Sequence, residues 1–444
     1  MKYISYYSAG WRRYQARLQR FARLKHLLKK LPLLLVISGG IFLIVGFIFF
    51  SVSWLAGQLK QTDQRSFYPN SESDVKPERL SLQDLSDFFD DGATGSFRLA
   101  DQFVLEKDGS RFTIRTTIDV KLQKYIDHLL RRSKSLQAAV VVLNADDGRV
   151  LALSSHDAVG TQENLCLQAD FPAASLFKIV SAAAALEAAG FTPDKVVFYK
   201  GSKHTLYKYQ LKESDGPHGI STKFRKAFAS SNNSVFGKVG IYTLGQKVIA
   251  DYAEKFFFNR PIPFDLQVGV STIEVPADDF GLAEIASGFN KRTLISPLHA
   301  AMLASVVADN GKMAAPWLVD SISDEAGKDI YQAGRSVLNA PINRKTAEDL
   351  KVLMQDAVVY GTGRTAFRKL HRKKEFKNFS LGAKTGTIND RTDTYKYDWL
   401  AAYALTPDRT KGICISVVSV HGEKLGVRSS ELARAIINYH FTSK

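Results

Sequence analysis

The feature that most limits how this chain can fold is a run of 26 residues, 31–56, without a single charged side chain. At 1.5 Å of rise per residue, a helix of that length spans about 39 Å, more than the roughly 30 Å of hydrocarbon in a bilayer. Residues 1–31 carry nine Lys and Arg and no acidic residue, which favours a cytoplasmic N-terminus, and Trp54 lies where interfacial aromatics gather. A cleaved signal peptide is the alternative, but its apolar core has only about 7 to 15 residues. We therefore expect a single-pass signal anchor in the cytoplasmic membrane, with the rest of the chain extracytoplasmic.

The basic tail also accounts for much of the charge of the chain. Lys and Arg number 60 against 44 Asp and Glu, a formal net charge of +16, and the tail supplies nine of the positive charges. A basic total can indicate a nucleic-acid binder. Here the basic run abuts the apolar span, so we expect membrane lipid as a partner and no nucleic acid.

Cysteine and histidine usage argues against a metal centre. Cys166 and Cys414 are the only cysteines, and no Cys-x-x-Cys or Cys/His cluster occurs. The nine histidines are scattered, with His204 and His218 the closest pair. We expect no metal and no cofactor. Whether the two cysteines pair in an oxidising compartment stays open.

Composition divides the chain into four parts. Residues 1–30 form the cytoplasmic basic tail and residues 31–56 the signal anchor. Residues 57–112 are polar and rich in acidic and turn-forming residues, which predicts a juxtamembrane spacer too short for an enzymatic domain. Residues 113–444 remain for one folded domain.

Strands are predicted near both ends of this domain. Residues 138–143 and 149–154 are β-rich and flank a turn that ends at Gly148, the pattern of a hairpin. Residues 399–405 and 412–420 are two further apolar strands. An antiparallel sheet built from both ends of the domain is therefore expected.

Helical patterns occupy the remainder. Asp119 precedes apolar residues at helical spacing up to residue 130, which indicates a capped helix. Residues 172–375 are helix-rich, and residues 427–439 form a closing helix. Strands at both ends with helices between them indicate a layered α+β domain.

The strongest chemical signal is Ser175-Leu176-Phe177-Lys178, immediately before an apolar helical stretch. Residues three apart share one face of a helix, so the Lys178 amine can reach the Ser175 hydroxyl. A serine needs such a base to become a good nucleophile, and a buried lysine with a lowered pKa can serve.

Two further motifs follow downstream. Either Ser230 with Asn232 or Ser231 with Asn233 forms a Ser-x-Asn motif, and Phe236, three residues after Asn233, favours the second register. Lys384-Thr385-Gly386-Thr387 contains the only Lys-Thr-Gly of the chain.

Ser-x-x-Lys, a Ser/Asn motif and Lys-Thr-Gly in this order are typical of penicillin-binding proteins and class A β-lactamases. Over residues 113–440 the chain resembles this serine acyl-transferase superfamily, and in particular a penicillin-binding transpeptidase domain. The resemblance implies an antiparallel sheet with helices on both faces and an all-helical subdomain.

The resemblance also implies roles at the reacting bond. Ser175 would attack the carbonyl between two D-alanines of a peptidoglycan stem peptide, with Lys178 taking its proton. Ser231 would relay a proton to the leaving amine, and Asn233 would orient Lys178 and the substrate amide. β-Lactams would acylate Ser175 because they mimic the D-alanyl-D-alanine end.

The third motif would bind the rest of the substrate. Lys384, Thr385 and Thr387 would face its terminal carboxylate, and Gly386 would allow a close approach of the strand. The backbone N–H groups of Ser175 and Thr387 would form the oxyanion hole.

Several members of the superfamily fit this set of motifs. We expect a monofunctional D,D-transpeptidase that relies on a separate membrane glycan polymerase. A D,D-carboxypeptidase or a β-lactamase is the alternative, but no Glu-x-x-Leu-Asn segment, a source of a deacylating base, lies between the second and third motifs. A non-catalytic β-lactam sensor or scaffold is the third possibility.

One glycine-rich segment has two interpretations. Residues 360–364, Tyr-Gly-Thr-Gly-Arg, could pass for a phosphate loop, but they lack its lysine and its strand-to-helix setting. We interpret them as a loop that borders the cleft.

Overall fold

A computed structural model describes residues 100–107, 109–158, 160, 164–213, 219–390, 392 and 394–443. These residues belong to the second of two compact units, Val75–Lys444. The predicted tail, the signal anchor and most of the spacer lie outside the described residues. Within the part that is described, no helix is both long and apolar enough to cross a bilayer.

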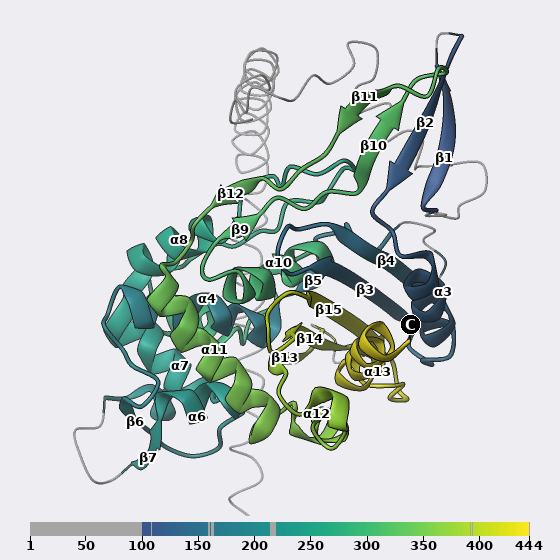
Figure 1. The fold of residues 1–444 in the computed structure, drawn as a ribbon. Coiled ribbons are helices and arrows are strands. Elements are labelled where there is room, and N and C mark those ends of the chain that lie inside the picture. The colour runs from purple at the N-terminus through teal and green to yellow at the C-terminus, as the bar shows by residue number, and fades with distance from the viewer. Residues whose placement is uncertain are drawn as a thin grey trace, which may run out of the picture. The chain divides into compact units, whose positions relative to one another are not determined.

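A five-stranded antiparallel sheet forms the centre of the domain, in the order β13-β14-β15-β3-β4 (Figure 1). Its strands are β3 (Gln137–Asn144), β4 (Val150–Asp157), β13 (Ser380–Asn389), β14 (Lys396–Leu405) and β15 (Gly412–His421). β15 pairs with β3, which joins the C-terminal strands to the N-terminal hairpin. The prediction of an antiparallel sheet built from both ends is confirmed.

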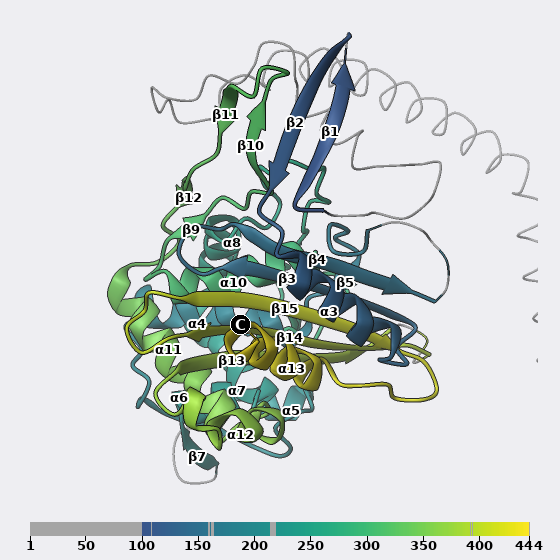
Figure 2. The same ribbon diagram turned by 45° about the vertical axis from the view of Figure 1, so that its right-hand side comes forward.

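Alternating side chains of β3 show why helices cover both faces of this sheet. Val140 and Val142 pack into a core with α3 (Val120–Arg131), α12 (Arg364–His371) and α13 (Ser429–Thr442). Val141 and Leu143 point to the other face, into the core that α4 (Lys178–Glu187), α10 (Pro297–Ala308) and α11 (Arg344–Val359) share. Figure 2 shows α3 and α13 in front of the strands and α4 and α10 behind them. Because side chains alternate along a strand, an apolar run that is buried on both faces needs helices on both.

The predicted helix starts and turns are confirmed at several points. The Asp119 side chain accepts a hydrogen bond from the Leu122 N–H at 3.0 Å and caps α3. Gly148, with φ of +85°, closes the turn between β3 and β4. All residues of α10 are buried, which explains its apolar character all the way round.

A helical subdomain adjoins the face that α4 and α11 cover. It contains α5 (Lys208–Leu211), α6 (Phe224–Ala229), α7 (Asn233–Val239), the π-helical turn η2 (Gly240–Leu244), α8 (Gly245–Lys255) and α9 (Asp279–Ser287). Short elements complete the domain: β5 (Phe171–Pro172) with β8 (Leu294–Ile295), β6 (Val196–Tyr199) with β7 (Ile220–Lys223), β9 (Met313–Ala314) with β12 (Val337–Asn339), and the 3-10 turns η1 (Ala174–Phe177) and η3 (Lys374–Phe376). The antiparallel pair of β6 and β7 packs against α6 and α7, so the subdomain is not entirely helical.

A second antiparallel sheet, in the order β1-β2-β10-β11, extends from the domain at the upper right of Figure 1. Its strands are β1 (Gln102–Lys107), β2 (Ser110–Thr116), β10 (Val319–Ser323) and β11 (Asp329–Gln332). Ile114 pairs with Ile322 in this sheet. The predicted boundary between residues 112 and 113 therefore falls inside β2. Sequence patterns gave no sign of this strand pairing, since β10, which pairs with β2, comes about 200 residues later in the chain.

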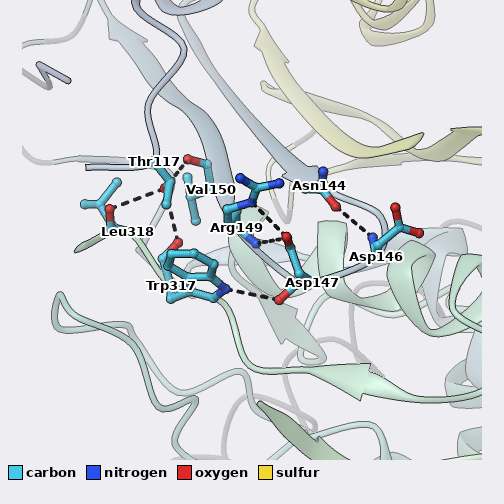
Figure 3. A network of polar contacts seen from close by, with 8 residues as sticks. All are labelled: Thr117, Asn144, Asp146, Asp147, Arg149, Val150, Trp317 and Leu318. Carbon is cyan, nitrogen blue, oxygen red and sulfur yellow. Dashed lines mark hydrogen bonds and ion pairs between the residues drawn. The ribbon is translucent and has the colours of Figure 1, made fainter. Parts of the chain in front are cut away.

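A polar network joins the β3–β4 turn to the segment that leads into β10 (Figure 3). Thr117 Oγ1 donates to the carbonyl of Val150 at 2.7 Å, and Trp317 Nε1 donates to the carbonyl of Asp147 at 3.1 Å. Arg149 forms an ion pair with the Asp147 carboxylate at 2.8 Å. These contacts tie the second sheet to the central one.

Both cysteines are buried free thiols. Both belong to the hydrophobic core that includes α10, and Cys414 lies on β15. Burial raises the pKa of each thiol. The pairing that the sequence left open is absent from the structure.

Candidate active site

Ser175 lies in η1, the turn that leads into α4, and is half-buried. Ala174 before it has a φ of +48°, in the left-handed region that residues other than glycine rarely adopt. Gly288, also left-handed with φ of +63°, packs on this turn so closely that a Cβ there would collide with the Ala174 carbonyl oxygen. A strained turn therefore presents the hydroxyl at the start of a helix.

Lys178 is the first residue of α4, and its amine is fully buried. Its Nζ lies 2.8 Å from Ser175 Oγ, 2.8 Å from Asn233 Oδ1, and within hydrogen-bond reach of the Ser287 carbonyl. Burial, and then the positive charge of Lys384, lower the pKa of Lys178 well below its ordinary value. A neutral amine has two N–H groups for the amide and carbonyl oxygens, which leaves its lone pair for the Ser175 hydroxyl.

The second motif lies where α6 ends and α7 begins. Ser231, with φ of +54°, places its Oγ 3.0 Å from Lys384 Nζ. Asn233 holds Lys178 through its oxygen and donates through Nδ2 to the His204 carbonyl at 3.0 Å.

The residues of the other register serve the helix ends. Ser230 donates to the Lys226 carbonyl at 2.8 Å, and Asn232 caps α7 by accepting from the Val235 N–H at 3.1 Å. The structure thus brings Ser231 and Asn233 into the cluster around Ser175, and not Ser230 and Asn232.

The third motif lies on β13, the edge strand of the central sheet, beside η1. Lys384 is fully buried, its Nζ also donates to the Thr385 carbonyl at 2.7 Å, and burial lowers its pKa to about 7. A Cβ on Gly386 would lie 3.4 Å from the Ser175 nitrogen, so β13 runs close beside the nucleophile. Thr385 is half-buried, and Thr387 is exposed on the same strand.

Comparison with known proteins decides which family this arrangement belongs to. Residues 138–438, more than half of the chain, match the sequence model described as the penicillin binding protein transpeptidase domain. The chain belongs to this family.

The curated relatives include proteins named as penicillin-binding proteins and as peptidoglycan D,D-transpeptidases. Peptidoglycan D,D-transpeptidase PbpA of Mycobacterium tuberculosis is 26% identical over 381 residues, which cover 76% of this chain and 73% of the relative. Stage V sporulation protein D of Bacillus subtilis is 24% identical over 312 residues, 66% of this chain. The match covers 46% of that protein, so the chain spans about half of its length.

Solved structures of penicillin-binding proteins share the fold. Penicillin-binding protein A from M. tuberculosis, determined as a ceftriaxone acyl-enzyme complex, superimposes with a TM-score of 0.59 at 24% identity. The match covers 73% of this chain and 79% of that one. The α+β arrangement of sheet and helices is therefore that of a penicillin-binding transpeptidase domain.

Three contacts of this penicillin-binding protein site were missed by sequence reasoning. The Ser287 carbonyl binds Lys178, the His204 carbonyl holds Asn233, and Thr362 Oγ1 lies 2.5 Å from Thr385 Oγ1. Backbone carbonyls leave no trace in residue type, so the first two had no signal. The position of Thr362 did have a signal in the sequence, because it belongs to residues 360–364, which we interpret as a loop bordering the cleft.

Among the described residues, no group of three or more His, Cys, Asp or Glu could hold a metal ion. The arrangement of a buried amine beside a hydroxyl, at the start of a helix and next to an edge strand, is suited to acyl transfer through serine.

Proposed function

We propose that this protein is a membrane-anchored, monofunctional D,D-transpeptidase that cross-links peptidoglycan stem peptides through an acyl-enzyme on Ser175 and is inhibited by β-lactams. The observation that carries the proposal is the buried Lys178 amine 2.8 Å from Ser175 Oγ. Family membership and the name of the relative PbpA, a peptidoglycan D,D-transpeptidase, support it.

Acylation begins at this pair. The Lys178 lone pair accepts the Ser175 proton as Ser175 Oγ bonds to the carbonyl carbon of the penultimate D-alanine. The Ser175 N–H, at the start of a helix, donates to the oxygen that becomes negative, together with a backbone N–H of the β13 edge at Thr387. Collapse of this intermediate breaks the peptide bond and leaves the acyl group on Ser175.

The leaving amine needs a proton, and Ser231 is positioned to deliver it. Its Oγ accepts a hydrogen bond from Lys384, so the hydroxyl proton is free to be donated to the departing D-alanine amine, and the proton that Lys178 took from Ser175 replaces it on Ser231. Lys384 and the hydroxyls of Thr385 and Thr387 hold the terminal carboxylate before that step. The amine of a second stem peptide then attacks the ester, its proton passes to Lys178 and from there to Ser175 Oγ as the ester bond breaks, and Ser175 is released.

Membrane anchoring is the part of the proposal that rests on sequence alone. The uncharged run at residues 31–56, preceded by nine basic residues, supports a single span with an extracytoplasmic catalytic domain. We propose a separate glycan polymerase as partner because residues 57–112, between this run and the catalytic domain, are too short for a polymerase domain. A pull-down that recovers no polymerase, with unaltered glycan synthesis in a deletion strain, would count against that partner.

Intact mass spectrometry of the full-length protein in detergent tests the chemistry. After incubation with a penicillin we expect one stable adduct on the wild type and none on Ser175→Ala. A folded wild type that takes up no penicillin would favour a non-catalytic scaffold, and an adduct lost within seconds would favour a β-lactamase.

A stem-peptide assay with an added acceptor amine separates transfer from hydrolysis. The proposal requires a cross-linked product together with released D-alanine. Release of D-alanine without any cross-linked product would assign the protein as a carboxypeptidase.

A further inference from the structure

The turn between α11 and α12, residues 360–363, touches two of the three motifs at once. The Thr362 N–H donates to the carbonyl of Ala229 at 3.1 Å, on α6 just before the second motif. Its side-chain Oγ1 lies 2.5 Å from Oγ1 of Thr385 in the third motif. One threonine therefore connects the end of α6, two residues before Ser231, to the strand that carries Lys384.

Strong contacts hold this turn in place. The Asp356 carboxylate, near the end of α11, is 4% exposed and accepts two hydrogen bonds from Arg225, at 2.7 and 2.8 Å. Lys226 Nζ lies 3.3 Å from the same carboxylate and 3.6 Å from the centre of the Tyr360 ring. Gly361 follows, where a Cβ would collide with the Ala229 carbonyl oxygen. The Thr362 hydroxyl is thus positioned by the packing of α6 against α11.

The two hydroxyls have two hydrogens between them, and only one can occupy the space between the oxygens. If Thr362 donates to Thr385, the Thr385 hydrogen is free to point at a further acceptor. Thr362 is exposed and Thr385 half-buried, so such an acceptor can arrive from solvent. A hydroxyl that accepts one hydrogen bond while donating another is polarised and donates more strongly.

We propose that Thr362 is a positioning residue that donates to Thr385 Oγ1 and thereby aims the Thr385 hydroxyl at the terminal carboxylate of the substrate. The inference rests on the proposed function, since it needs a substrate with that carboxylate. The turn would then contribute to the preference for substrates with a terminal carboxylate, without taking part in the reaction of Ser175 and Lys178.

Two substrates isolate this role in the full-length protein. One is a D-alanyl thioester whose leaving group ends in a carboxylate, and the other is the same thioester with that carboxylate methylated. For Thr362→Val we expect kcat/KM to fall about 5- to 10-fold with the free acid, as for the loss of one hydrogen bond between neutral groups, and less than about 2-fold with the ester. Thr362→Ser keeps the hydroxyl and restores selectivity for the acid.

Thr365→Val is the matched control, because Thr365 is exposed on α12 three residues later. It should leave both rates unchanged. Adding Thr362→Val to Thr385→Val should cost no further selectivity, because the hydroxyl that Thr362 aims is already gone. If Thr362→Val does not fold, Thr362→Ser against Thr362→Ala provides the same comparison.

Two outcomes would overturn this inference while leaving the proposed function intact: an equal loss on both substrates, which marks a structural role, or no loss on either. A folded wild type that reacts with neither thioester and forms no penicillin adduct would overturn both. The inference is supported if Thr362→Val loses the preference for the acid over the ester while Thr362→Ser and Thr365→Val keep it.

Discussion

Lys384 Nζ lies 3.0 Å from Ser231 Oγ, although 153 residues separate them. Both side chains are buried, and the positive charge of Lys384 contributes to the lowered pKa of Lys178. The site therefore holds two buried amines with different tasks. One must be neutral to accept a proton, and the other must be charged to bind a carboxylate.

The pH profile of acylation should reveal this division. With a β-lactam that carries a carboxylate, the second-order rate should rise with pH as Lys178 loses its proton. It should fall above the Lys384 pKa of about 7, as the charge that binds the carboxylate is lost. Stopped-flow acylation between pH 5 and 9 measures both limbs. With the methylated thioester the falling limb should shrink, and an identical fall for both compounds would contradict the role of Lys384.

Lys178→Met should remove the base and keep the shape of the side chain. We expect acylation by penicillin to slow by roughly 10²- to 10⁴-fold, the usual contribution of a general base. Lys203→Met is the control, because Lys203 is exposed and only its backbone carbonyl meets Asn233. Intact mass against time measures the rate. Acylation of Lys178→Met at the wild-type rate would assign the base elsewhere.

Neighbouring serines test the register of the second motif. Ser231→Ala should slow acylation roughly 10²- to 10⁴-fold, because the leaving amine loses its proton donor. Ser230→Ala should change the rate less than about 2-fold, since its hydroxyl only donates to a carbonyl of α6. Steady-state release of D-alanine from a stem peptide reports both. Equal losses would undermine the placement of Ser231.

Gly288→Ala should damage the nucleophile turn specifically. Gly190 has the same φ of +63° but open space around its Cβ position, so Gly190→Ala measures the backbone cost alone, about 1 kcal/mol. Gly288→Ala adds a clash with the Ala174 carbonyl, and we expect a larger loss of stability and at least a roughly tenfold slower acylation. Thermal unfolding and penicillin uptake are the measurements. Equal effects of the two substitutions would show that the turn tolerates the methyl group.

Asp356→Asn should destabilise the fold more than Asp349→Asn on the same helix. The Asp356 side chain is 4% exposed and pairs with both Arg225 and Lys226, whose side chains are 30% and 41% exposed. Because these partners are partly solvated, we expect a loss of about 1 to 2 kcal/mol, less than for a fully buried pair. The Lys345–Asp349 pair at the surface should contribute less than about 0.5 kcal/mol. Urea denaturation compares the two variants.

Local patterns were sufficient to predict much of this protein. The cap at Asp119, the hairpin at Gly148 and the three-residue spacing of Ser175 and Lys178 are each encoded within a few residues. Hydrophobic periodicity, capping and helical spacing act over that range, so they can be recognised without a fold.

Tertiary structure decided the contacts between distant segments. It selected Asn233 over Asn232 as the partner of Lys178, placed the Ser287 carbonyl on the same amine, brought Thr362 to Thr385, and paired β2 with β10. These contacts join segments tens to hundreds of residues apart, and a residue type carries no information about which distant group it will meet. The sequence alone determined the reactive groups and the local elements that carry them, whereas the packing of α11 against α6 and β13, and of α9 and β13 against η1, decided their geometry.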